Sequence, residues 1–175
     1  MNQVIPEQQC HCECGKTEFT LKGKPLMRMF CHCTICQEFN EKSFSDVTVF
    51  LTKDIEFDQA QNVDFKKYKS PPAVDRGKCG SCHKPVIEFL NIPLFPALTI
   101  IPSQNIEKGS YLPESCAHIF YHRRVNYIND NLPKYSGFIS SQTLFTKKLV
   151  LGMLGRKKIH NKGDQVRHRE IKVQL

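Results

Sequence analysis

The chain has 175 residues, an apolar content of 40% and a formal net charge of +8. This length is most simply one domain, and the composition argues against both a disordered protein and an integral membrane protein. The longest apolar stretch covers only residues 90–101 and contains two prolines, so it is too short to cross a bilayer.

Short runs of β-type residues predict strands along most of the chain. Gly and Pro residues separate the runs, and this pattern is typical of a mostly antiparallel β domain. In chain order the runs are residues 17–23, 47–51, 85–90, 98–102, 118–125 and 169–175. Residues 142–154 have leucines at helical spacing and predict one amphipathic helix. Residues 155–165 predict an exposed loop that leads into the last strand, or a partly disordered tail.

Most of the positive charge lies near the C-terminus. Residues 147–175 contain nine Lys or Arg residues and two acidic residues, whereas residues 1–146 are nearly neutral. Contact with nucleic acid or a membrane surface would therefore involve this tail alone. A solvated extension is the simpler interpretation, so we expect neither a nucleic-acid partner nor a membrane.

Nine cysteines in four groups are the strongest chemical signal. The first ten residues show neither the basic nor the apolar segment of a secretory signal, so we expect a reducing, cytoplasmic location. In such a location clustered cysteines bind metal more often than they form disulfides. The groups are Cys10, Cys12 and Cys14; Cys31, Cys33 and Cys36; Cys79 and Cys82; and the single Cys116.

The spacing allows two partitions of these cysteines between metal sites. In the first, a closed structural zinc site has four thiolate ligands, Cys12, Cys14, Cys79 and Cys82. A catalytic zinc site with one exchangeable position then has three, Cys31, Cys33 and Cys36. In the second partition, Cys33 and Cys36 join Cys79 and Cys82 in a single ribbon-like zinc site. The spacing alone does not decide between them.

Three motifs follow one another in a fixed order. C-x-C-G occurs at residues 12–15, C-H-C-x-x-C at residues 31–36, and Y-x-S-P…R-G-x-C-x-x-C at residues 68–82. Residues 116–137 follow as a segment in which a H-I strand precedes a loop ending in L-P-x-Y. Over roughly residues 6–139, this order resembles the glutathione-dependent formaldehyde-activating (GFA) family, also known as the centromere protein V/GFA domain.

The resemblance implies a mostly β, zinc-bearing β-tent fold of antiparallel sheets, shared in outline with methionine sulfoxide reductase B. The GFA-like zinc domain would cover residues 6–139, and residues 140–175 would form a basic C-terminal extension. Up to two zinc ions per chain are implied. The structural ligands would be Cys12, Cys14, Cys79 and Cys82. The ligands of the catalytic zinc, which are also the catalytic residues, would be Cys31, Cys33 and Cys36.

The family's activity implies a carbon–sulfur lyase-type enzyme. The activity for which the family is named joins formaldehyde and glutathione into S-hydroxymethylglutathione, so the expected partners are a small glutathione-like thiol and an aldehyde. The chain departs from the family pattern at Lys78 and His83, where an aromatic residue and a glycine are usual. Cys10 also offers a different register for the first pair, although Gly15 favours Cys12 with Cys14.

Few side chains are candidates for proton transfer or substrate contact. His32 and His118 are candidates for proton transfer, although each can equally serve a structural role. Three further residues on a predicted strand are candidates for contact with a substrate carboxylate: His122, Arg123 and Arg124. Cys116 is expected to be a buried free thiol.

Two other functions compete with the GFA-like enzyme. One is a non-catalytic zinc module whose basic tail contacts acidic partners, as in the chromatin-associated branch typified by centromere protein V. The other is a methionine sulfoxide reductase B-like enzyme that uses the ribbon-like zinc site, with Cys116 as its nucleophile.

Overall fold

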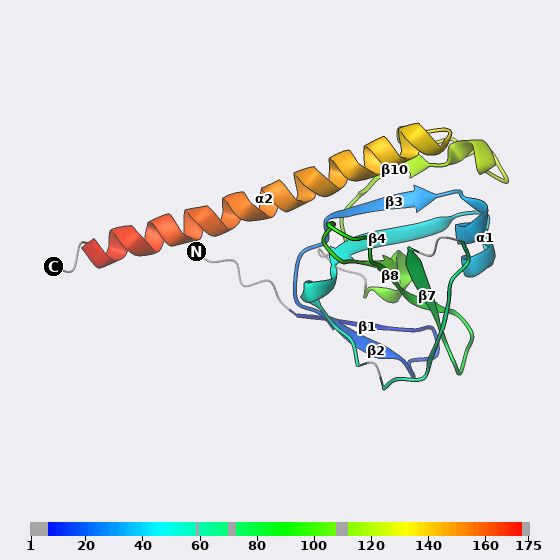
Figure 1. The fold of residues 1–175 in the computed structure, drawn as a ribbon, viewed down its shortest axis with the longest axis horizontal. Coiled ribbons are helices and arrows are strands. Elements are labelled where there is room, and N and C mark those ends of the chain that lie inside the picture. Colours follow the sequence, from blue (N-terminus) through cyan, green and yellow to red (C-terminus); the bar gives the residue numbers. More distant parts are fainter. Residues whose placement is uncertain (1–6, 59, 70–72, 108–111, 173–175) are drawn as a thin grey trace.

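A β body and a long C-terminal helix make up the computed structural model (Figure 1). The structure describes residues 7–58, 60–69, 73–107 and 112–172, and from residue 157 onward it describes the backbone alone. No helix in these ranges is both long enough and apolar enough to cross a bilayer. The mostly β fold expected from the sequence is confirmed.

Two sheets form the body within the described residues. The larger has seven strands in the order β10–β3–β4–β9–β8–β7–β6. They are β3 (Met27–Cys31), β4 (Ser45–Leu51), β6 (Val63–Lys66), β7 (Val74–Cys79), β8 (Pro85–Leu90), β9 (Leu98–Pro102) and β10 (Ser115–Ile119). The smaller sheet contains β1 (Gln8–His11), β2 (Glu18–Leu21) and β5 (Ile55–Glu56). Short 3₁₀ helices cover Thr52–Asp54, Ser103–Asn105 and Tyr121–Arg123.

The helix α1 (Thr34–Asn40) follows β3 almost directly, and the residue that caps its N-terminus is a cysteine. Cys33 is its N-cap, because its backbone is extended and its Sγ accepts a hydrogen bond from the Cys36 backbone N–H at 3.4 Å. Its C-cap is Glu41, which takes the left-handed conformation with φ of 53°. This tight strand-to-helix turn brings the second cysteine group together.

Two hydrophobic cores stabilise the body, and each includes cysteines. The first core packs β3, β4 and β10 against the helix α2 (Phe138–Lys172) and includes the second cysteine group. Leu144 and Leu149 of α2 are buried in it, so the first half of this helix is part of the body. The second core packs β2 against β4, β8 and β9, and it includes cysteines of the first and third groups.

The strand pairing is mostly antiparallel, as expected, although β10 runs parallel to β3. The long connection after β9 returns the chain to the free edge of β3 in the same direction, as parallel pairing requires. The strand predicted at residues 118–125 ends at Ile119, because Phe120 takes a left-handed backbone with φ of 54° and a 3₁₀ turn follows.

The C-terminal residues are helical rather than a loop and a strand. The helix α2 includes residues 155–165, predicted as a loop, and residues 169–172, predicted as the start of a strand. Residues 173–175 of that predicted strand lie outside the described residues. A helix satisfies its backbone hydrogen bonds within its own segment, whereas a strand needs a neighbour. The helix predicted at residues 142–154 is confirmed as part of α2.

Candidate metal centres

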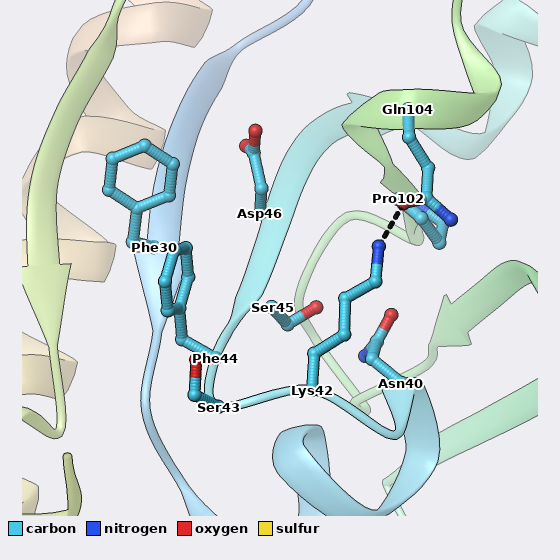
Figure 2. A pocket seen from close by; sticks show the side chains of 9 residues that line it. All are labelled: Phe30, Asn40, Lys42, Ser43, Phe44, Ser45, Asp46, Pro102 and Gln104. Carbon is cyan, nitrogen blue, oxygen red and sulfur yellow. Dashed lines mark hydrogen bonds between the residues drawn. The ribbon is translucent and has the colours of Figure 1, made fainter. Parts of the chain in front are cut away.

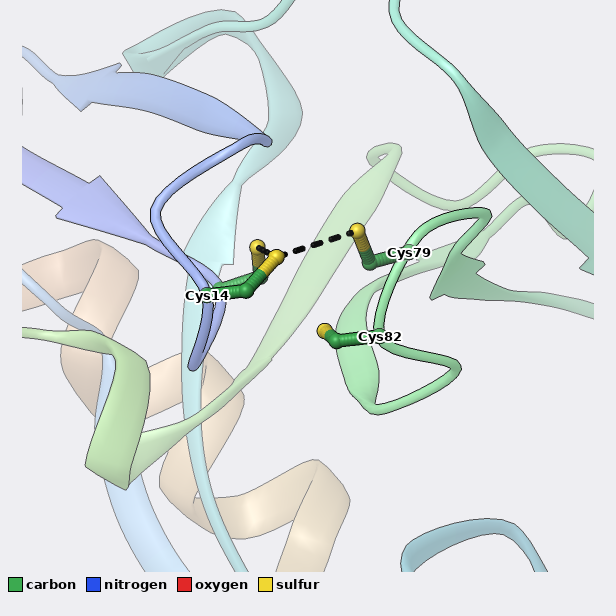
Figure 3. Close-up of side chains that lie close together, drawn as sticks. Cys14, Cys79 and Cys82 are labelled. Atoms are coloured by element: carbon green, nitrogen blue, oxygen red, sulfur yellow. Dashed lines mark hydrogen bonds between the residues drawn. The ribbon is translucent and has the colours of Figure 1, made fainter.

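The structure brings four cysteines from distant segments together. Their sulfur atoms all lie within 4.8 Å of one another, and the residues are Cys12, Cys14, Cys79 and Cys82. Figure 3 shows the sulfurs of Cys14, Cys79 and Cys82 directed toward a common point. The Cys12–Cys14 and Cys14–Cys79 Sγ–Sγ distances are 3.4 and 3.8 Å. Tetrahedral zinc with bonds of about 2.3 Å separates its sulfurs by about 3.8 Å, so this donor set fits zinc.

Two turns present these sulfurs. In the turn after β1, Gly15 takes a φ of 74°, and the Thr17 backbone N–H donates to Cys12 Sγ at 3.3 Å. In the turn after β7, the left-handed residue is His83, with a φ of 58°. Gly80 serves a different purpose there, because a Cβ atom would lie 2.3 Å from the side-chain oxygen of Asn62. Glycine at that position therefore permits a close approach rather than a positive φ.

The second partition of the cysteines is wrong. The sulfurs that lie beside Cys12 and Cys14 are those of Cys79 and Cys82, and Cys33 and Cys36 are not in this group. The ribbon-like site is therefore not formed.

The register that pairs Cys10 with Cys12 is wrong too. Cys10 is buried in the second core, outside the group of four sulfurs. Burial, followed by the nearby Glu107 charge, raises the pKa of the Cys10 thiol to about 12.

The second cysteine group forms a separate centre with three sulfurs. Cys31 ends β3, Cys33 caps α1, and Cys36 lies in the first turn of α1. Their sulfur atoms lie within 4.8 Å of one another, and no fourth His, Cys, Asp or Glu among the described residues joins them. Cys31 and Cys36 are buried, whereas Cys33 is half-buried. Three thiolates with one position free is the donor set of a catalytic zinc site.

The three thiols strongly perturb one another's ionisation. Hydrogen bonds from Cys31 and then Cys36 lower the pKa of the Cys33 thiol to about 3. The same contacts raise the pKa values of Cys31 and Cys36 above the ordinary thiol value. One thiolate is thus stabilised by two thiol protons, and a bound cation would take the place of those protons.

A buried ion pair beside this centre was not found from the sequence. Arg76 of β7 and Glu88 of β8 lie directly opposite each other, with Nε and Oε2 2.7 Å apart. Burial raises the pKa of Glu88 to about 7, although the Arg76 charge opposes this shift. Arg76 belongs to the R-G-x-C motif, but the motif says nothing of its cross-strand partner. Glu88 carries no sequence signal beyond an acidic residue in a predicted strand.

The two candidate histidines form a buried hydrogen-bonded chain. His32 Nε2 and His118 Nδ1 lie 2.8 Å apart, and His118 Nε2 lies 2.8 Å from a carboxylate oxygen of Asp130. The His32 ring also packs against Phe44 and Tyr121. Burial and the His118 charge lower the pKa of His32 to about 4. These contacts tie the loop after β10 to β3, so they support a structural role for both histidines.

The other candidates lie at the surface or lack activation. His122, Arg123 and Arg124 are exposed, and they follow β10 in a 3₁₀ turn rather than in a strand. Arg124 lies over the Tyr121 ring, 4.8 Å from its centre. Cys116 is half-buried, and burial raises the pKa of its thiol, whereas a cysteine nucleophile needs a lowered pKa. The structure thus lacks both features that the sulfoxide reductase hypothesis requires, the ribbon-like site and an activated Cys116.

A cavity of about 440 Å³ lies at the C-terminal end of α1 (Figure 2). Lys42 donates a hydrogen bond to Gln104 across it, and Phe30 and Phe44 form an aromatic wall. No cysteine lines this cavity. It is therefore separate from the three-sulfur centre.

One of three comparisons with known proteins agrees with the motifs. A family model described as "Glutathione-dependent formaldehyde-activating enzyme" matches residues 7–123, which is more than half of the chain. No curated protein matches the sequence at a significant level. One crystal structure of a Rhodobacter sphaeroides protein, a structural-genomics target, is 13% identical with a TM-score of 0.47. That match covers 73% of this chain and 99% of the other.

Proposed function

The chain belongs to the glutathione-dependent formaldehyde-activating enzyme family, and we propose that it is a zinc-dependent, carbon–sulfur lyase-type enzyme acting on thiol–aldehyde adducts. In the synthetic direction the thiol sulfur forms a bond to the carbonyl carbon, and the π electrons of the carbonyl move to oxygen. The thiol proton is released, and one proton is added to that oxygen. The product is an S-hydroxymethyl thioether, that is, a hemithioacetal.

The observation that carries this proposal is the pair of unlike cysteine centres. Four sulfurs that enclose one point suit a structural metal, whose ligands would be Cys12, Cys14, Cys79 and Cys82. Three sulfurs suit a reactive one, whose ligands and catalytic residues would be Cys31, Cys33 and Cys36. Zinc held by these three would lower the pKa of a substrate thiol in the remaining position.

The chain's own residues shape the reactive centre. Cys33 is the least buried residue of the three, so substrate would approach from its side. The N-cap of α1 and the end of β3 hold the three sulfurs in place. The proposed catalytic domain is residues 6–139, and residues 140–175 form its extension. Its partners would be a glutathione-like thiol and an aldehyde, in a reducing, cytoplasmic location.

The proposal is tested by metal content and by exchange kinetics on the same samples. Native mass spectrometry should find two zinc ions in the wild type and one in a Cys31→Ser variant with an intact fold. Exchange NMR with ¹³C-formaldehyde and glutathione should show faster adduct formation with the wild type than without protein. The Cys31→Ser variant should lose this acceleration.

Two results would contradict the proposal, and they differ in meaning. Two bound zinc ions without any acceleration would indicate a non-catalytic zinc module. Retention of both ions and full acceleration in Cys31→Ser would show that the second group is not the reactive centre.

A further inference from the structure

The buried Arg76–Glu88 pair lies on the same side of the larger sheet as the three-sulfur centre. Arg76 is opposite Glu88, and the row of paired residues continues through Ile100 and Val49 to Met27. Residues directly opposite each other share a sheet face, and alternate residues along a strand do too. Met27 and Cys31 are four residues apart on β3. The ion pair and the Cys31 sulfur therefore face the same side of the sheet.

Aromatic contacts also place the pair near α1, the helix that Cys33 caps and that contains Cys36. The Tyr68 ring packs edge-on against the Phe39 ring of this helix, with the ring centres 5.9 Å apart. The guanidinium lies over the ring of Tyr68, 5.8 Å from its centre. Arg76 and Tyr68 both belong to the third sequence motif, and the fold brings them together beside the centre.

The pair leaves buried polar atoms without hydrogen-bond partners. The side chains of Arg76 and Glu88 are only 10% and 2% exposed. Although Nε and Oε2 are 2.7 Å apart, the N–H is not aligned for a hydrogen bond, and Glu88 Oε1 has no partner. Each unsatisfied buried polar group costs about 1–3 kcal/mol, and a buried ion pair gives little stability in return. A ligand or catalytic role is one explanation for such groups.

We propose that Arg76 is a catalytic residue that donates a hydrogen bond to the oxygen of the thiol–aldehyde adduct, and that Glu88 is a positioning residue that orients the guanidinium. This inference rests on the proposed function. Carbon–sulfur bond formation moves the carbonyl π electrons to oxygen, which becomes an alkoxide before it takes a proton from water. A guanidinium stays charged at all relevant pH values, so it stabilises the alkoxide without losing its own proton.

The proposal is tested with the zinc-loaded full chain and a matched control. Arg76→Met should lower turnover about 100-fold with little change in the KM for glutathione, as expected for loss of one oxyanion donor. Arg76→Lys should recover part of this loss, and Glu88→Gln should lower turnover less than Arg76→Met does. Arg28→Met is the control, because Arg28 pairs with Asp46 across neighbouring strands of the same sheet at 2.7 Å. Its turnover should equal that of the wild type.

A second measurement needs no variant that might fail to fold. The assigned Arg76 Nε–Hε NMR signal of the wild type should shift when formaldehyde is added to the protein with glutathione, and not with glutathione alone. An unmoved signal, or an Arg76→Met variant with wild-type turnover, would overturn the role of Arg76 alone. A wild type without any turnover would overturn the proposed function, and the role of Arg76 with it.

Discussion

The four-cysteine centre should provide much of the stability of the β body. Cys14 and Cys79 are 65 positions apart, so a metal bound by both closes a long loop. By analogy with a disulfide, closing a loop of this length removes about 4 kcal/mol of chain entropy from the unfolded state. A domain of this size has a total stability of roughly 5–15 kcal/mol. We predict that Cys79→Ser lowers the free energy of unfolding by about 4 kcal/mol.

The matched variant Cys33→Ser separates this effect from metal loss in general. It should release the other ion, but the second group spans only six positions, from Cys31 to Cys36. Because the entropy of loop closure scales with the logarithm of loop length, Cys33→Ser should cost about 2 kcal/mol less than Cys79→Ser. Urea unfolding with zinc content measured on the same samples gives both quantities. Equal destabilisation by the two variants, each having lost one ion, would refute the loop-closure reasoning.

Three further predictions concern the buried Glu88, the packing of α2 and the thiol of Cys116. The folded chain holds the Glu88 proton up to about pH 7, whereas the unfolded chain loses it near the ordinary pKa of 4.5. The free energy of unfolding should therefore fall by about 2 kcal/mol between pH 5.5 and 7.5 on account of Glu88 alone. In urea titrations, Glu88→Gln should remove that part of the fall. A Glu88→Gln variant that shows the same fall as the wild type would contradict the raised pKa of Glu88. Leu149→Ala, at a side chain only 2% exposed, should cost about 2–5 kcal/mol in thermal or chemical unfolding, whereas Leu151→Ala, at 52% exposed, should cost under about 0.5 kcal/mol. Equal costs would mean that α2 is not packed in the core. Cys116→Ser should keep adduct turnover within about twofold of wild type. Loss of turnover in this variant would instead support Cys116 as a nucleophile.

The sequence predicted the local parts of the candidate centres well. The C-x-C and C-x-x-C spacings identify sulfurs that converge within one turn, and the structure brings each of these pairs together. The order of the motifs identified the family, which the family model confirms. The helix at residues 142–154 was also found, because helical spacing is a local property.

The sequence failed where a partner strand decides the outcome. Alternation at residues 169–175 predicted a strand, but no local pattern shows whether a strand has a neighbour, and residues 169–172 are helical. The parallel pairing of β10 with β3 was missed for the same reason. So was the pairing of Arg76 with Glu88, since nothing in the two segments states which residues lie opposite each other.

By itself, then, the sequence identified the groups of neighbouring cysteines whose sulfurs can converge, because only a short stretch of backbone separates the members of each group. Tertiary structure decided which distant pairs share one centre. Cys79 and Cys82 meet Cys12 and Cys14 because the turn after β7 lies beside the turn after β1, a contact set by how the two sheets pack. The same packing leaves the triplet at the end of β3 without a fourth cysteine and places a buried charge pair on its side of the sheet.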